Sequence, residues 1–376
     1  MKEIIIAFSI ITVLLFGGCT NIIENPEKPA NDDTPITSDV KETSGVDVVP
    51  TMSDEISKDS TWCGTFQLVW NDMKNEVVKQ DVVFTPQLKM VENLNKEEFN
   101  ESMLSPEYYY KIYGIKTLEL KKTIEKGIKD KFNQTSDILD DFSWSSDELD
   151  DPNDPYNRRY FFYTMLYRKF EFLKEFDKLK NQKFANKYDN IEYFGIDKNT
   201  KDEIGNQIRV LYYNSKNDFA LLINTKTNDE VIFCKNPVGN TFNEIYNNMN
   251  TKADAYNGSR SFKGIDEFKA PCLEFNEKRE YIELEGKMFK TADPYYDTAE
   301  IDKAIQTVKF SLDEKGGEIK SEAAIDLKVS ATSVQEPKID EPRYFYVDDT
   351  FAIFLRERGR EMPYFAGRIE DITKFQ

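Results

Sequence analysis

The sequence offers few residues that could carry out catalysis. It contains no histidine, which excludes Ser-His and Cys-His nucleophile pairs, histidine general bases and zinc sites that need a histidine ligand. No Gly-rich phosphate-binding loop or paired-carboxylate motif stands out. We therefore expect a protein that is not an enzyme and needs no cofactor, and an uncharacterised enzyme is the least favoured of three hypotheses.

Cys19 is the residue near the N-terminus with a predicted chemical role. It follows Gly17-Gly18 and an apolar run, residues 4–16, that is too short for a comfortable membrane span and is typical of a secretory signal. The LFGGC end resembles the bacterial lipobox, although Phe16 stands where that pattern usually has Leu. We expect residues 1–18 to be a signal peptide and Cys19 the lipid attachment site; an ordinary signal with an incidental cysteine is the alternative.

The other cysteines and an acidic stretch have structural interpretations. Cys63, Cys234 and Cys272 lack Cys-x-x-Cys spacing, so we expect small buried side chains and at most one disulfide. The stretch from Asp140 to Asp154 is rich in carboxylates but lacks the ligand spacing and the glycine of a calcium loop. We expect a solvated loop there and no metal site.

Charge and composition restrict the partners and divide the chain. With 50 basic and 68 acidic residues the net charge is −18, which repels nucleic-acid phosphates, so no nucleic-acid partner is expected. Residues 19–57 are polar with few large apolar side chains, and we expect a disordered tether. Residues 58–376 would form the folded domain, a monomer held at the extracellular face of the cell membrane.

The periodicity of the domain predicts a mixed α+β fold. Phe66, Val69, Trp70 and Met73 recur at helical spacing, and helices are expected at 65–78, 117–132, 241–256 and 280–289. Runs rich in β-branched and aromatic residues predict later strands. These runs are 159–172, 207–214, 218–226, 230–235, 268–275, 304–312, 343–357 and 363–370. Without regular alternation of strand and helix, we expect large, mostly antiparallel sheets.

The segment 317–329 combines features of a strand and of a loop. Small or apolar residues, including Ile319, Ile325 and Leu327, alternate with mostly charged ones, as in a strand with one buried face. The segment nevertheless begins after Gly316 and is followed by Ser, Thr and Pro residues typical of an exposed loop. The sequence alone leaves open whether it is a strand, a loop, or a segment able to be either.

Six weak motifs, in order along the chain, resemble the serpin family between about residues 60 and 372. The motifs are DVVFTP at 81–86, the helix and turn at 124–139, the long strand at 161–177, the strand and following segment at 268–284, AIQTVKFSLDEKGGE at 304–318 and the C-terminal pair at 347–371. The sequence departs from the family at Thr164, where Asn is usual, and at Phe172, where Trp is usual. The region between Pro86 and Leu118 is also too short for all the helices that serpins usually have there.

The resemblance implies a fold and a set of site residues. In serpins the segment after Asp-Glu-Lys-Gly is an exposed reactive loop that inserts into a sheet once a target protease has cut it. The implied hinge residues here are Glu314, Gly316, Gly317, Glu318, Ile319, Ser321 and Ala323. The candidate bait residues, for a trypsin-like protease, are Lys328, Lys338 and Arg343. Lys320 falls on the wet face and is expected to be harmless, whereas Gly317, where Thr is usual, is expected to loosen the hinge.

Two hypotheses share this fold. The first is a lipid-anchored inhibitor of serine or cysteine proteases that acts as a suicide substrate. The second is a non-inhibitory binding lipoprotein in which 317–329 is a permanent strand. The position of that segment in a structure distinguishes them best.

Overall fold

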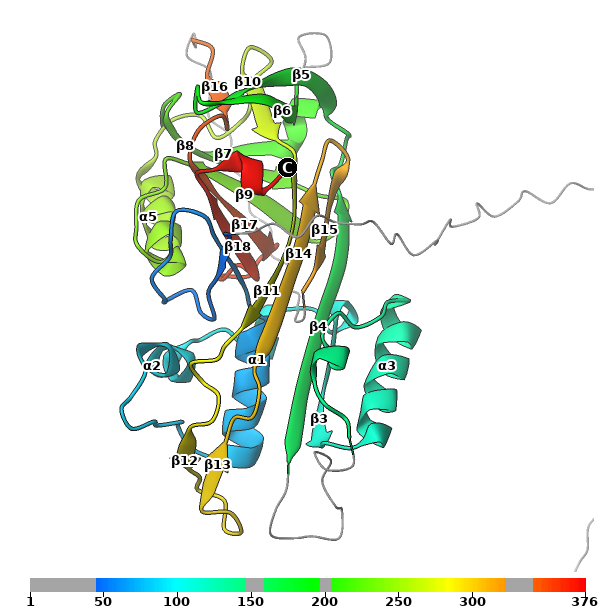
Figure 1. Cartoon of the computed structure of the whole chain (residues 1–376). Coiled ribbons are helices and arrows are strands. Elements are labelled where there is room, and N and C mark those ends of the chain that lie inside the picture. Colours follow the sequence, from blue (N-terminus) through cyan, green and yellow to red (C-terminus); the bar gives the residue numbers. More distant parts are fainter. Residues whose placement is uncertain (1–44, 146–158, 197–203, 322–340) are drawn as a thin grey trace, which may run out of the picture. The chain divides into compact units, whose positions relative to one another are not determined.

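The computed structural model describes residues 45–145, 159–196, 204–321 and 341–376 (Figure 1). All of these belong to the unit Ser38–Gln376. Cys19, Ala323, Lys328, Lys338 and most of the acidic stretch lie outside the described residues. None of the helices in the described ranges combines the length and apolar character that a membrane crossing requires.

Four α-helices are described. They are α1 (Thr65–Asp72), which continues as a π-helical turn (Met73–Val78), α2 (Lys89–Lys96), α3 (Leu118–Phe132) and α5 (Phe242–Ala255). The sequence predicted all but α2. Thr117 and Thr241 begin α3 and α5 by accepting hydrogen bonds from the amides of Leu120 and Glu244, each at 3.1 Å.

A five-stranded sheet carries the candidate site. Its order is β11 (Leu273–Glu280), β14 (Ile305–Leu312), β15 (Gly316–Lys320), β4 (Tyr160–Glu171) and β3 (Tyr109–Ile115). Every neighbouring pair in it is antiparallel. Its long strands run through the centre of Figure 1, with α1 and α3 on either side of them in that view.

The remaining strands form two further sheets and a hairpin. The seven-stranded sheet has the order β1 (Asp47–Val48), β2 (Ser60–Cys63), β18 (Phe365–Ile369), β17 (Phe351–Glu357), β9 (Asp229–Lys235), β8 (Asp218–Asn224), β7 (Ile208–Ser215). The four-stranded sheet has the order β16 (Tyr344–Tyr346), β10 (Glu267–Pro271), β6 (Tyr188–Gly195), β5 (Asp177–Phe184). Strands β12 (Met288–Lys290) and β13 (Thr298–Glu300) form the hairpin. Of the described strand pairs, β1–β2 and β10–β16 are parallel and the others antiparallel, so the predicted α+β class with mostly antiparallel sheets is confirmed.

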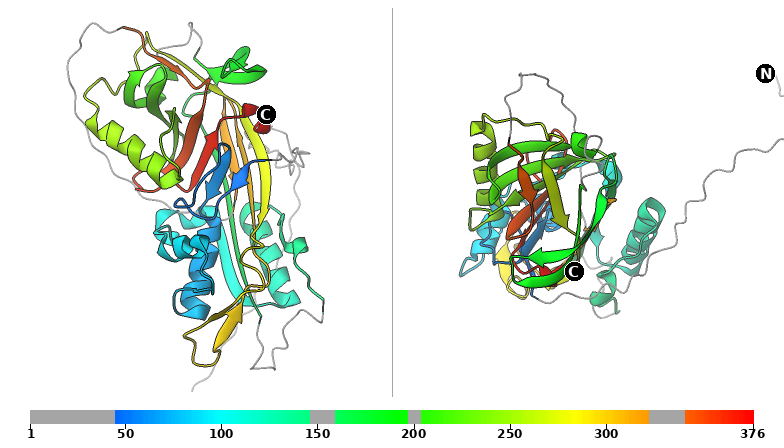
Figure 2. Two further views of the ribbon diagram at one scale, coloured as in Figure 1. Left: turned by 60° about the vertical axis from the view of Figure 1, so that its left-hand side comes forward. Right: turned by 90° about the horizontal axis from the view of Figure 1, so that it is seen from above.

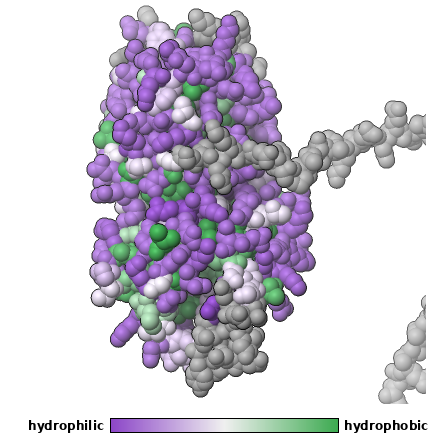
Figure 3. Space-filling view, in the orientation of Figure 1, coloured by the Kyte–Doolittle hydropathy of each residue, from purple (hydrophilic) through white to green (hydrophobic). Residues whose placement is uncertain are grey.

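The core is divided among the two faces of the five-stranded sheet and the interior of the other sheets. The largest cluster joins residues of all three sheets and α5, which lies beside the seven-stranded sheet (Figure 2). Phe242 and Tyr246 of α5 pack on Phe354 of β17. A second cluster lies around α1 and the β12–β13 hairpin, and a third joins α3 to β4. The face of the molecule seen in Figure 3 is largely hydrophilic, as the alternation in these strands requires.

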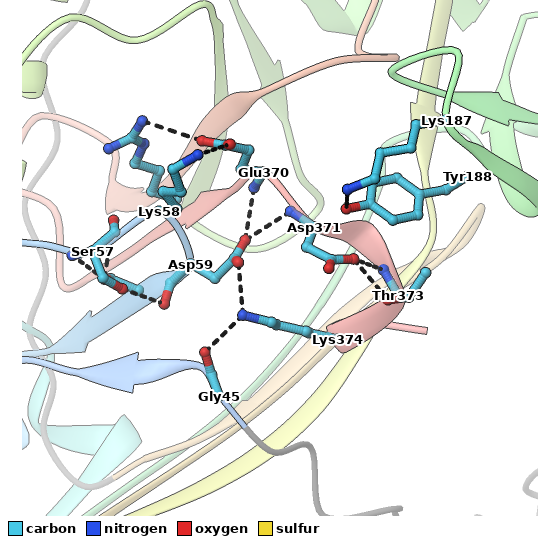
Figure 4. Close-up of polar contacts among 12 residues, drawn as sticks. Gly45, Ser57, Lys58, Asp59, Lys187, Tyr188, Glu370, Asp371, Thr373 and Lys374 are labelled. Carbon is cyan, nitrogen blue, oxygen red and sulfur yellow. Dashed lines mark hydrogen bonds and ion pairs between the residues drawn. The ribbon is translucent and has the colours of Figure 1, made fainter.

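The folded domain begins earlier than residue 58, so the predicted boundary of the tether is wrong. Residues 46–52 are buried in the described fold apart from Asp47, which is half-buried, and β1 pairs with β2. Figure 4 shows why the chain is held here: Lys374 donates to the carbonyl of Gly45 at 3.0 Å and to Asp59 at 2.8 Å. The other oxygen of Asp59 accepts from the amides of Glu370 and Asp371, both at 2.8 Å.

Three predicted elements need correction. The expected strand 268–275 divides at Cys272 into β10 and β11, which belong to different sheets, and the expected strand 343–357 divides into β16 and β17. The expected helix at 280–289 is a turn followed by β12. Tyr281 and Leu284 are buried at helical spacing, but Gly286 has φ of 66°, a left-handed conformation that ends any helix.

Candidate functional site

The hinge, residues 314–321, begins in a tight turn after β14. The amide of Asp313 donates to the carbonyl of Gly316 at 2.8 Å, and the Asp313 carboxylate accepts from the amide of Lys315, also at 2.8 Å. An aspartate that accepts from the amide two residues on is a common way to build a turn. The chain therefore reverses at once, and the hinge runs back antiparallel to β14.

The hinge is a strand that lies between two others. Gly317–Lys320 of β15 pair with Leu312–Lys309 of β14, and Gly316–Lys320 pair with Glu171–Tyr167 of β4. The first part of the segment 317–329 is therefore a central strand of the sheet in the uncut chain. Residues 322–329 lie outside the described part.

Both glycines of the hinge are required by close backbone approach. At Gly316, where φ is 154°, an added Cβ would lie 2.1 Å from the carbonyl oxygen of Phe170. At Gly317 it would lie 2.5 Å from the carbonyl oxygen of Ser311 and 2.6 Å from the ring of Phe170. Gly317 thus does more than loosen the hinge: it allows the hinge to enter between β14 and β4.

The two faces of the hinge follow the alternation predicted from the sequence. Ile319 and Ser321 are buried, and Ile319 lies opposite Phe310 of β14. On the other face, Glu318 makes an ion pair with Lys169 at 3.1 Å and Lys320 makes one with Asp137 at 2.7 Å. Burial of an isoleucine side chain stabilises the inserted strand by about 1.5–3 kcal/mol.

Beyond Ser321 the described part of the sheet has a gap between β4 and β14, which we call the slot. Within the described residues, β4 pairs with β15 over 167–171 but with β3 alone over 160–166. Likewise β14 pairs with β15 over 309–312 but with β11 alone over 305–308. Two strand edges thus face each other without a described strand between them, and such edges favour pairing with another strand.

The slot opens into a cavity of about 460 Å³. Its floor is the face of α1 and the following turn, with Phe66, Trp70 and Met73, and its sides include Phe162 of β4 and Gln306 of β14. Large apolar side chains therefore form much of the wall of the cavity. It matches the buried face of an alternating strand better than it matches a polar ligand.

A polar network closes the end of the slot nearest the hinge. The side-chain amide of Gln306 donates to the carbonyl of Cys63 at 3.0 Å and to the hydroxyl of Thr65 at 2.8 Å, and its oxygen accepts from Tyr281 at 2.7 Å. The hydroxyl of Ser321 lies 3.1 Å from that of Thr65. Burial raises the pKa of Cys63 to about 11, so its thiol stays protonated and inert.

A buried ion cluster lies on the core side of the hinge. Arg168 of β4 is directly opposite Ile319 and is fully buried. Its guanidinium donates to Asp229 of β9 at 2.8 Å and bonds to Glu357 of β17, and its carbon lies 3.9 Å from the ring centre of Tyr108. Burial disfavours the charge, but Tyr364 and the two carboxylates raise the pKa of Arg168, which remains a cation. The cluster joins the five-stranded sheet to the seven-stranded sheet where the hinge enters.

The residues predicted for the hinge lie together in the structure, and sequence reasoning missed the residues around them. Glu314, Gly316, Gly317, Glu318, Ile319 and Ser321 form the turn and inserted strand described above. The sequence did not indicate Arg168, Gln306 or Asp137. The sequence around Arg168 gives no sign that its guanidinium is buried, because the carboxylates that pair with it are 61 and 189 residues away.

Arg343 is held by the fold and is not presented as a bait residue. Its guanidinium donates to Asp266, to the carbonyl of Ser259 and to the carbonyl of Ser261, each at 2.6 Å. Asp266 is fully buried, and the amide of Arg343 also donates to it. These contacts argue against Arg343 as a bait residue, whereas Lys328 and Lys338 lie outside the described residues.

Comparison with known proteins concerns the fold alone. No protein-family model and no curated protein matches the sequence.

The architecture resembles that of serpins. Similar solved structures include a cleaved serpin 42Da, with 13% identity and a TM-score of 0.41 over 67% of this chain and 65% of that chain. Another is Serpin48 of the insect Tenebrio molitor, with 13% identity and a TM-score of 0.33 over 66% of this chain and 63% of that chain. A third is thyroxine-binding globulin in complex with thyroxine, with 11% identity and a TM-score of 0.40 over 83% of this chain and 92% of that chain. The match spans a little under two thirds of the first two serpins.

Proposed function

We propose that this protein is a serpin-like protease inhibitor, attached by a lipid on Cys19 to the outer face of a cytoplasmic membrane. It would act as a suicide substrate. A target protease attacks a bond in the segment after the hinge, and the segment then enters the slot while still joined to the protease through the acyl-enzyme ester. No group of this chain needs to act as a catalyst in that sequence, because the protease supplies the nucleophile.

The observation that supports this proposal best is that the described part of the hinge stops part-way along the slot. Among the described residues, pairing ends at Lys320, although β4 and β14 continue toward the slot for several residues more. A permanent sheet would leave those edges unpaired at a cost, because backbone groups without partners destabilise a fold. A sheet that must accept a further strand after cleavage requires them.

The register of the hinge fixes where the following residues would lie after insertion. Continued without a bulge, the pairing would place Ala323 between Thr164 and Gln306 and Ile325 beside Phe162. Both would face the cavity above α1, whereas Asp326 would lie on the opposite face of the strand. The small Ala323 would pass the polar network around Gln306, and the larger Ile325 would enter the wider apolar part.

The bait bond would follow Lys328 or Lys338, because Arg343 is already paired with Asp266. A lysine at that position suits a trypsin-like specificity pocket. Replacing Lys328 and Lys338 by alanine, one at a time, identifies the bait residue as the one whose loss abolishes inhibition. Arg343→Ala serves as the contrasting variant, since it should reduce stability rather than change protease specificity.

The alternative function is that of a binding lipoprotein whose hinge is a permanent strand. The presence of β15 in the sheet of the uncut chain favours it. The deciding experiment mixes the protein with trypsin-like proteases and analyses the products on a denaturing gel. A stoichiometric complex that survives denaturation supports the inhibitor, and simple cleavage without any complex supports the alternative.

A further inference from the structure

Lys320 lies on the outer face of the hinge but is far from a freely solvated lysine. Its side chain is only 10% exposed. The ammonium group donates to the carboxylate of Asp137 at 2.7 Å and to the carbonyl of Thr135 at 3.0 Å. Both partners belong to the segment that follows α3, so Lys320 joins the hinge to an element distant in sequence.

The segment that receives Lys320 is itself held in place. The hydroxyl of Ser136 accepts hydrogen bonds from the amides of Ile138 at 3.2 Å and Leu139 at 3.1 Å. Leu139 is buried against Ile124 and Ile128 of α3. Asp137 therefore stands on a firm local structure and can fix the position of a lysine that reaches it.

The cross-strand neighbours make this ion pair necessary. Lys320 is directly opposite Lys309 of β14, and like charges directly opposite each other destabilise a sheet. Asp137 offsets that repulsion. Two residues earlier in β15, Glu318 lies opposite Lys169 of β4 and makes an ion pair with it. The charges on the outer face of the hinge are thus paired with opposite charges in the observed register. A shift of the hinge by one or two residues would separate these pairs.

We propose that Lys320 is a positioning residue that holds the hinge inserted to its observed depth before any protease acts. This inference rests on the proposed inhibitory function. With Gly316–Lys320 already ordered, insertion after cleavage proceeds by adding residues to the end of an existing strand, without a new nucleation step. A hinge released from Asp137 would start from outside the sheet and insert more slowly, so more of the acyl-enzyme would be hydrolysed first.

The first test measures amide hydrogen exchange in the peptide containing Gly316–Lys320 of the intact, uncut protein. Lys320→Ala and the milder Asp137→Asn should each speed exchange about 10- to 100-fold, the range that a charge-assisted hydrogen bond supplies. Lys309→Ala, which removes a lysine from the same face, should not. The exchanged pair Lys320→Asp with Asp137→Lys should restore slow exchange. Unchanged exchange in both single variants would overturn the proposal, as would equal acceleration by Lys309→Ala.

The second test separates this inference from the proposed function. With an inhibited protease in hand, Lys320→Ala should raise several-fold the number of protein molecules consumed for each protease molecule inactivated, and the exchanged pair should lower it again. An unchanged ratio would overturn the role of Lys320 in insertion. If the wild-type protein inhibits no protease while the exchange results are as expected, the inhibitory function fails and the positioning role of Lys320 stands.

Discussion

Cleavage in the segment after the hinge should stabilise this protein, although nicking a chain usually has the opposite effect. Insertion of residues 322–327 would bury Ile325 and Leu327, which contribute about 3–6 kcal/mol together. Pairing with both strand edges would add roughly 6–8 hydrogen bonds at about 1 kcal/mol net each. Ordering about six residues costs roughly 6–12 kcal/mol. Taken at the midpoints of these ranges, the balance is about 2–3 kcal/mol in favour of insertion.

That balance corresponds to a rise in melting temperature of about 3–5 °C for a protein of this size. A recognition sequence for a specific protease, placed between Lys328 and Lys338, would allow clean cleavage. Differential scanning calorimetry then compares the cut and uncut forms of the same protein. Both forms keep every residue, so the comparison depends only on whether the segment is free to enter the slot.

Two variants make the result specific. Ile325→Asp would place an unpaired carboxylate over the apolar floor formed by Phe66 and Trp70, and it should abolish the rise, since that cost exceeds the whole gain. Asp326→Lys would replace one charge by another on the opposite face of the strand, away from that floor, and should leave the rise within about 1 °C of the original. A melting temperature unaltered by complete cleavage, or a rise that survives Ile325→Asp, would refute insertion into the slot.

Three further predictions concern other parts of the chain. Cys19→Ala should leave the protein shed or retained as a precursor; a variant that is processed and still membrane-bound would exclude the lipid anchor. The stretch from Asp140 to Asp154 should give no saturable heat on calorimetric titration with micromolar calcium, and one-to-one binding would contradict this. Asp59→Ala should lower the free energy of unfolding by about 2–4 kcal/mol, because two backbone amides and a lysine lose their acceptor. Lys58→Ala is the control: its side chain is 75% exposed, so its loss should cost less than about 0.5 kcal/mol in a denaturant titration.

The sequence predicted elements where one face of a segment is plainly apolar. It located α1, α3, α5 and most long strands, as well as the buried face of the hinge at Ile319. It missed β5, because four of the eight residues in DKLKNQKF are charged and only Phe184 is fully buried. It missed α2, whose eight residues include three apolar ones and no strong cap at the preceding Leu88. In both cases tertiary packing, rather than local pattern, stabilises the element.

The site was harder to predict than the fold because it depends on where pairing stops. Alternation in a strand says which side chains are buried, but it does not say which strand lies beside it or how far the pairing extends. Both β4 and β14 extend beyond the level of Lys320, whereas the described part of β15, which pairs with both of them, ends there. The slot is the space left between the two longer strands. Its neighbours Arg168 and Gln306 acquire their roles only from residues far away in sequence.

The depth of the hinge also bears on the choice between the two functions. A permanent strand would be expected to end where its flanking strands end, with its last residues bonded on both sides. Here β15 ends at Lys320, and the next residue, Ser321, is bonded through its side chain to Thr65 at the entrance to the apolar cavity. The strand is thus anchored by Lys320 on one face and Ser321 on the other at the point where the slot begins. An arrangement that fixes a strand end beside two unpaired edges is suited to a strand that lengthens, which favours the inhibitor.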